Sequence, residues 1–112
     1  MHSINTLSGR GNTVNYTKKS DGNYGVTWGK ASFIITQEII DDFLANFFAV
    51  KDNWYKLGSS LEPIIEDGFG YYLYNKHIGL SPKHASAVAA IMVNEKLLEY
   101  SGTKPILLRR IV

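Results

Sequence analysis

The sequence predicts a single α+β domain with an N-terminal three-stranded antiparallel meander, three or four helices and a C-terminal β-hairpin. Short alternating segments separated by glycine turns fill the first third of the chain, and apolar residues recur at helical spacing in the middle. A second pair of β-rich segments closes the sequence. The length of 112 residues and the hydrophobic fraction of 45% are typical of one globular domain, so residues 1–112 are expected to fold together.

The N-terminal third of the chain predicts a small sheet. Residues 1–12 are polar and show no periodicity, so they are expected to form a loose arm or an irregular edge. Alternating β-rich segments then predict strands at residues 13–17, 24–28 and 32–35. The turn between the first two strands contains Asp21-Gly22, and glycine accepts the positive φ that tight hairpin turns need.

The middle of the chain predicts a helix that begins after Thr36, because threonine is a common N-cap. The apolar residues of this helix recur every three or four positions and form one stripe: Ile39, Ile40, Phe43, Leu44, Phe47 and Phe48. Residues 51–63 are expected to be a loop or a short turn, because a Gly-Ser-Ser sequence interrupts any longer helical pattern there.

The aromatic segment 69–78 fits either a helix or a buried strand, and the turn that follows it favours the helix. That turn, Gly79-Leu80-Ser81-Pro82, combines a helix-stopping glycine with a serine N-cap and a proline at the first helical position. The next helix is expected over residues 82–96. Two β-rich segments, 97–100 and 106–110, then predict the terminal hairpin.

This C-terminal order of helix, glycine turn, helix and hairpin resembles a winged helix-turn-helix domain. The resemblance implies nucleic-acid binding, with the second helix in the major groove and the hairpin touching phosphates. Matched by position, the nucleic-acid-binding residues would be Lys83, His84, Asn94, Lys104, Arg109 and Arg110. The second helix is rich in alanine, so the same shape could equally serve packing or dimerisation. The chain as a whole also resembles small bacterial proteins carried on mobile gene cassettes, a likeness that implies no activity.

Charge agrees with a nucleic-acid partner, whereas the aromatic residues point to a second kind of partner. Residues 36–67 carry seven acidic and two basic side chains, and residues 76–112 carry six basic and two acidic ones. Seven tyrosines, five phenylalanines and two tryptophans are many for one small core. Those gathered in the 54–74 region are expected to line a homodimer interface or a small-ligand pocket: Trp54, Tyr55, Phe69, Tyr71, Tyr72 and Tyr74.

An enzyme is the remaining alternative. A small hydrolase or nuclease could use His77 or His84 with the acidic pair Glu66/Asp67. A helix-breaking turn separates the two histidines, so they do not share a helix face as metal ligands would, and no catalytic residue, metal or cofactor is assigned. The lack of cysteine, of a signal-like start and of a long apolar stretch predicts a cytoplasmic protein with no membrane partner.

Overall fold

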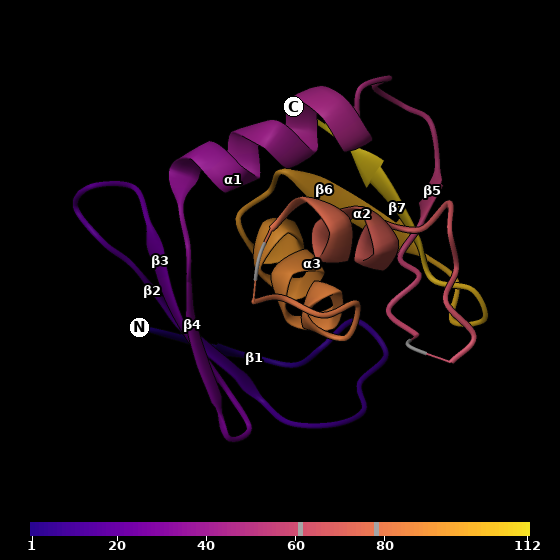
Figure 1. The fold of residues 1–112 in the computed structure, drawn as a ribbon. Helices are drawn as coiled ribbons and strands as arrows, with labels where there is room; N and C mark the ends of the chain where they lie inside the picture. Colours follow the sequence, from indigo (N-terminus) through magenta and orange to yellow (C-terminus); the bar gives the residue numbers. More distant parts are fainter. Residues whose placement is uncertain (61, 78) are drawn as a thin grey trace.

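The computed structural model describes residues 1–60, 62–77 and 79–112, and its fold is mixed α+β, as the sequence predicts. Two antiparallel sheets lie on opposite sides of α3 (His84–Asn94), the central helix in Figure 1. None of the described helices is long and apolar enough to cross a membrane. The detailed topology differs from the expected one in two places, one in each sheet.

Sheet A contains four strands in the order β1-β2-β3-β4, one more than the sequence predicts. These strands are β1 (His2–Ile4), β2 (Val14–Lys18), β3 (Tyr24–Trp28) and β4 (Ala31–Ile35). The meander of β2, β3 and β4 confirms the predicted one, and Gly22 has the positive φ, 87°, that its first turn needs. One face of the sheet is buried, and Tyr16 and Tyr24 are the largest buried side chains on its two central strands.

The N-terminal residues supply the additional strand, so the loose-arm alternative is wrong for His2–Ile4. β1 pairs antiparallel with β2, and the His2 ring stacks on the Tyr16 ring at a centroid distance of 4.8 Å. Ile4 is partly buried and packs against the core. A strand of three residues is too short to show a recognisable alternation, which is why the sequence pattern does not reveal it.

The helix after Thr36 begins as predicted but ends in a different geometry. Thr36 is extended, and its hydroxyl accepts a hydrogen bond from a main-chain N–H of the first turn at 3.2 Å. The helix α1 (Gln37–Asp42) continues as a π-helical segment, η1 (Phe43–Phe47), which Phe48 closes by donating its N–H to the Phe43 carbonyl at 2.8 Å. The predicted apolar stripe still faces the core, since Phe43 and Phe48 are fully buried.

The aromatic segment forms a helix, α2 (Phe69–Lys76), as the turn after it predicts. Gly79 in that turn has a φ of 90°, the left-handed conformation expected of a helix-stopping glycine. The next helix, α3, is shorter than the expected 82–96. Lys96 has a φ of 66°, so the chain has already left the helical conformation at that residue.

The terminal hairpin is confirmed, and it belongs to a three-stranded sheet B in the order β5-β7-β6. Its two predicted strands are β6 (Leu98–Ser101) and β7 (Leu107–Arg110). The third strand, β5 (Tyr55–Lys56), pairs with β7 and lies in the region expected to be a loop. Two residues carry no readable pattern, and β5 is held by tertiary packing, because the Tyr55 ring meets Phe48 edge to face at 5.5 Å.

The helix α3 fills the space between the two sheets. Seven of its eleven residues are buried, and four of those seven are alanines. Small side chains let the helix backbone approach β2 and β6, the strands that contact it on its two sides. Within the same core, an aromatic cluster joins η1 to α2, where the rings of Phe43 and Phe69 meet edge to face at 4.8 Å.

Close packing around α2 predicts an unusual effect of alanine at Gly70. Alanine ordinarily stabilises a helix interior by about 1 kcal/mol relative to glycine. A Cβ at Gly70 would instead collide with the Gly58 carbonyl oxygen and lie 3.0 Å from the Pro82 carbonyl oxygen. We therefore expect Gly70→Ala to lower the free energy of unfolding by about 1–3 kcal/mol in urea denaturation.

The control for this measurement is Asn75→Ala, at an exposed position of the same helix. It should change the free energy of unfolding by no more than about 0.5 kcal/mol. A Gly70→Ala protein as stable as the wild type would show that the loop at Gly58 moves aside without cost, contrary to the packing described.

Candidate ligand-binding groove

The helix expected to contact nucleic acid has no continuous exposed face. Lys83 precedes it and Asn94 ends it, and both are exposed, whereas residues 87–92 between them are buried. The His84 ring is partly buried and meets Phe33 edge to face at 5.0 Å. The Asn94 amide already donates a hydrogen bond to a tyrosine hydroxyl of β2 at 2.6 Å. α3 therefore presents no continuous exposed face in this structure.

The two arginines expected to contact phosphates hold sheet B in place. Arg109 forms an ion pair with Glu99, and its guanidinium lies 4.4 Å from the centre of the Trp54 ring. Arg110 donates hydrogen bonds to main-chain carbonyls in and just after η1, at 3.3 and 3.4 Å. Lys104 is different, because it is exposed in the turn between β6 and β7 and forms no ion pair with a described residue.

Half of the aromatic residues expected at an interface or in a pocket belong to the core or pack against it, namely Phe69, Tyr55 and Tyr72. Phe69 is fully buried. Three others are partly buried: Tyr55, Tyr71 and Tyr72. Trp54 is 41% exposed and Tyr74 is 49% exposed, but Trp54 stacks with Arg109 beside sheet B and Tyr74 lies on α2. The six rings therefore do not share one exposed face.

His77 contacts a different acid from the pair Glu66/Asp67 that the sequence suggests. Its Nε2 lies 3.2 Å from Oδ2 of Asp42, at the end of α1. The Tyr72 hydroxyl donates to the same carboxylate oxygen at 3.0 Å, and the Asn46 amide donates to the other oxygen at 2.7 Å. These contacts tie α1 and η1 to α2, and no serine is hydrogen-bonded to the cluster among the described residues.

The protonation states of Asp42 and Tyr72 suit a structural role for this cluster. Burial alone would raise the pKa of the Asp42 carboxyl, but hydrogen bonds from Asn46, Tyr72 and His77 outweigh it and hold the pKa below its ordinary value. Burial and the neighbouring carboxylate raise the pKa of Tyr72 to about 12. At neutral pH the carboxylate is therefore ionised and the tyrosine is protonated, which is the arrangement that the hydrogen bonds require.

The second of these histidines, His84, also has a hydrogen-bond partner within the protein. His84 Nδ1 accepts a hydrogen bond from the Ser81 N–H at 2.9 Å, just before α3 begins. Asp67 forms an ion pair with Lys56 at 3.1 Å. Among the described residues, no hydrogen bond or ion pair joins either histidine to Glu66 or Asp67. Among all the residues that the structure describes, no group of three His, Asp or Glu side chains is placed to hold a metal ion.

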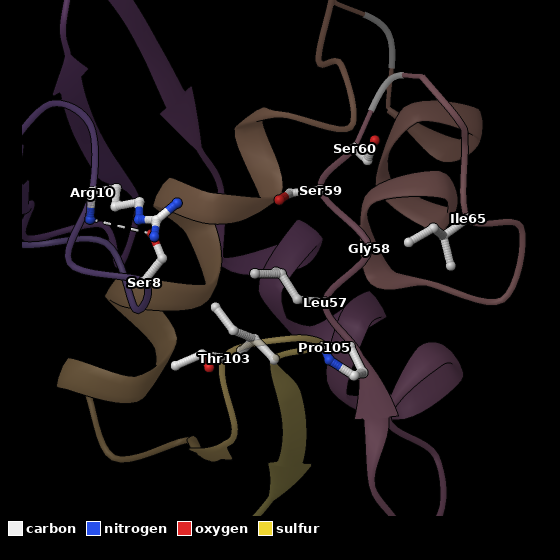
Figure 2. A pocket seen from close by; sticks show the side chains of 10 residues that line it. Ser8, Arg10, Leu57, Gly58, Ser59, Ser60, Ile65, Thr103 and Pro105 are labelled. Atoms are coloured by element: carbon white, nitrogen blue, oxygen red, sulfur yellow. Dashed lines mark hydrogen bonds between the residues drawn. The ribbon is translucent and has the colours of Figure 1, made fainter.

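A groove opens where three loops from distant parts of the sequence meet, as Figure 2 shows. It has a larger part of about 350 Å³ and a smaller part of about 200 Å³, which share three lining residues. Its polar lining consists of Ser8, Arg10, Ser59, Ser60, Thr103 and Lys104. Its apolar lining consists of Leu57, Ile65, Pro105 and Ile106. Hence one groove combines a cationic, hydroxyl-rich end with an apolar side.

The cationic end of the groove is built from the two ends of the chain. Arg10 comes from the loop between β1 and β2, and Lys104 comes from the turn between β6 and β7. In Figure 2 the Arg10 side chain points towards the groove, and Ser59 lies on the opposite side of the groove. The guanidinium and the ammonium form no ion pair with a described residue, and no acidic side chain is among the lining residues.

Local hydrogen bonds shape the loop that carries Arg10, and a glycine with positive φ shapes each of the two loops. The buried Thr6 hydroxyl donates to the Arg10 carbonyl, and the Gly9 N–H donates to the Thr6 carbonyl at 2.9 Å. Gly9 has a φ of 73°, and Gly102 in the other loop has a φ of 80°, so glycine is the residue that both turns favour. Arg10 and Lys104 therefore extend from constrained turns.

Of the residues that line this groove, the sequence predicts only Lys104 as a binding residue. The available signal for Arg10 was its position between Gly9 and Gly11, because glycines on both sides of a cation indicate an exposed turn. No protein-family model matches the chain, and no match was found among curated proteins or solved structures. The winged helix-turn-helix resemblance therefore stays a prediction.

The Asp42 cluster predicts how stability depends on pH. The folded pKa of Asp42 lies below its unfolded value, so its contribution is present above about pH 4 and is lost as pH falls through the folded pKa. We expect Asp42→Asn to lower the free energy of unfolding by about 1–3 kcal/mol at pH 7, because three hydrogen bonds lose a charged acceptor. The difference from wild type should narrow between pH 4 and pH 2, measured by urea denaturation across that range.

The control is Asp41→Asn, which removes the neighbouring exposed carboxylate. Its effect should stay within about 0.5 kcal/mol at pH 7. An Asp42→Asn protein that matches wild type at pH 7 would contradict the assigned role of the carboxylate.

Proposed function

We propose that the protein is a non-catalytic binding protein that recognises a phosphate group in this groove. The observation that carries the proposal is the convergence of Arg10 and Lys104 on one cavity that no acidic residue lines within the described chain. Two like charges beside one cavity repel each other, and a bound anion replaces that repulsion with two attractive interactions. The groove is therefore electrostatically suited to an anion.

The hydrogen-bonding groups of the groove favour phosphate among anions. A guanidinium such as that of Arg10 donates two parallel hydrogen bonds to a pair of phosphate oxygens, and the Lys104 ammonium adds a flexible point charge. The hydroxyls of Ser8 and Thr103 line the same smaller part of the groove and can donate to further oxygens. A tetrahedral anion with several acceptor oxygens uses all four donors.

The lining favours binding over catalysis. None of the lining residues is a histidine or a carboxylate, the groups that most often act as a general base near neutral pH. The serine and threonine hydroxyls of the groove therefore have no such base among the groove residues to activate them. Of the three histidines, His2 stacks on Tyr16, and His77 and His84 are hydrogen-bonded to Asp42 and Ser81 outside the groove.

The apolar side of the groove indicates the size and character of the ligand. Leu57, Ile65 and Ile106 line the larger part, beside the cationic end. A small phosphorylated molecule with an apolar body would fill both parts. A nucleic-acid backbone carries the same phosphate chemistry, but the groove lining contains no aromatic ring on which a base could stack. Of these two sources of phosphate, the geometry therefore favours the small phosphorylated molecule.

Removing either cation should weaken phosphate binding. We expect Arg10→Gln and Lys104→Gln each to raise the Kd for phenyl phosphate by about tenfold, because each loses charge-assisted hydrogen bonds. Isothermal titration calorimetry at low salt measures this, with Lys51→Gln, an exposed lysine outside the groove, as the control. The proposal fails if the wild type binds neither phenyl phosphate nor single-stranded oligonucleotides at about 1 mM.

A series of alkyl phosphates tests the apolar side and separates the two phosphate sources. Each additional methylene from methyl to butyl phosphate should lower the Kd about fourfold, because it buries apolar area against Ile65 and its neighbours. Ile65→Ser should flatten this dependence on chain length. An oligonucleotide that binds more tightly than every alkyl phosphate, with no dependence on chain length, would assign the groove to nucleic acid.

A further inference from the structure

The smaller part of the groove carries more positive charge than one singly charged phosphate can balance. Arg10 and Lys104 both line it, and neither forms an ion pair with a described residue. A singly charged anion would leave one of the two positive charges unbalanced, whereas a doubly charged anion would balance both. The charge of the site therefore favours a dianion.

The acidic residues of the neighbouring segments do not supply this charge. The loops that carry Arg10 and Lys104, residues 5–13 and 102–106, contain no acidic residue. The segment that forms the other side of the groove carries Glu62, Glu66 and Asp67, but none of these lines the groove. Asp67 forms its ion pair with a lysine of β5. The two cations are therefore left to be balanced by a ligand.

The lining of the groove provides apolar contact on one side of a bound phosphate. Four polar residues alone line the smaller part, namely Ser8, Arg10, Thr103 and Lys104. All the apolar side chains of the groove line its larger part. One ester substituent can therefore lie on apolar surface, whereas a second would cover polar groups without replacing their hydrogen bonds.

The donors of the smaller part suit a phosphate with three terminal oxygens. The main chain of Arg10 is hydrogen-bonded to Thr6 and Ser8, whereas its guanidinium has no hydrogen-bond partner among the described residues. A guanidinium can bind two phosphate oxygens in parallel. The Lys104 ammonium and the Thr103 hydroxyl can then donate to the third oxygen. A phosphate diester has only two terminal oxygens, so it leaves part of this set unused.

We propose that the ligand is a phosphate monoester bound as its dianion, with its ester substituent in the larger part of the groove, an assignment that rests on the phosphate-binding function proposed above. The second negative charge adds an attractive interaction with each of the two cations. A phosphate diester, such as a nucleic-acid backbone, carries one charge and therefore binds more weakly.

Three phenyl esters test this preference by isothermal titration calorimetry at pH 8 and low salt. We expect phenyl phosphate to bind about tenfold more tightly than methyl phenyl phosphate, a diester with one charge. Phenyl sulfate keeps three terminal oxygens but carries one charge, so it should bind at least about threefold more weakly than phenyl phosphate. Lys104→Gln should reduce the preference for the monoester over the diester to about threefold, whereas Lys51→Gln should leave it unchanged.

The pH dependence of binding is a second readout. A phosphate monoester loses its second proton at about pH 6, whereas a diester keeps one charge. The described groove lining contains no histidine or carboxylate, the side chains that most often titrate between pH 5 and pH 8. The Kd for phenyl phosphate should therefore fall about fivefold from pH 5 to pH 8, and the Kd for methyl phenyl phosphate should stay constant.

The outcomes separate this proposal from the phosphate-binding function. A diester or a sulfate that binds as tightly as phenyl phosphate at pH 8, or a Kd for phenyl phosphate that does not change with pH, would overturn the dianionic monoester and leave phosphate binding intact. If none of the three esters binds at about 1 mM, the monoester is wrong, and the oligonucleotide measurement then decides whether the groove binds phosphate.

Discussion

The burial of α3 between two sheets is the constraint on which the rest of the structure depends. A helix can lie this close to strands on two sides because four of its buried residues are alanines. Its C-terminal end is fixed by polar contacts as well, since Glu95 accepts hydrogen bonds from Tyr16 at 2.8 Å and from Tyr24 at 3.4 Å. Burial raises the pKa of Tyr16 to about 12, so both hydroxyls remain donors at neutral pH.

The same burial explains how much of the fold the sequence predicts. The sequence predicts the elements that have strong local signals, namely the β2-β3-β4 meander, the capped helix after Thr36 and the terminal hairpin. The two missed strands, β1 and β5, are defined by what they pack against, because two or three residues carry no periodicity. The sequence pattern also does not predict the π-helical geometry of η1, because the apolar residues there keep nearly α-helical spacing.

The candidate site was less predictable than the fold, for a physical reason. The winged helix-turn-helix resemblance depends on the order of elements, and the order does not say which side of α3 faces solvent. Residues 87–92 of α3 are all apolar, and a helix that is apolar on every side is buried. The groove depends on Arg10 and Lys104, which come together only when the chain has folded, so no local spacing connects them.

The position of the groove also follows from the central helix. Because α3 and its two sheets form the buried body, the loops that leave this body are the segments free to carry polar and charged side chains. Gly9 and Gly102, both with positive φ, shape the main chain of these two loops, and Arg10 and Lys104 line the same cavity at the surface.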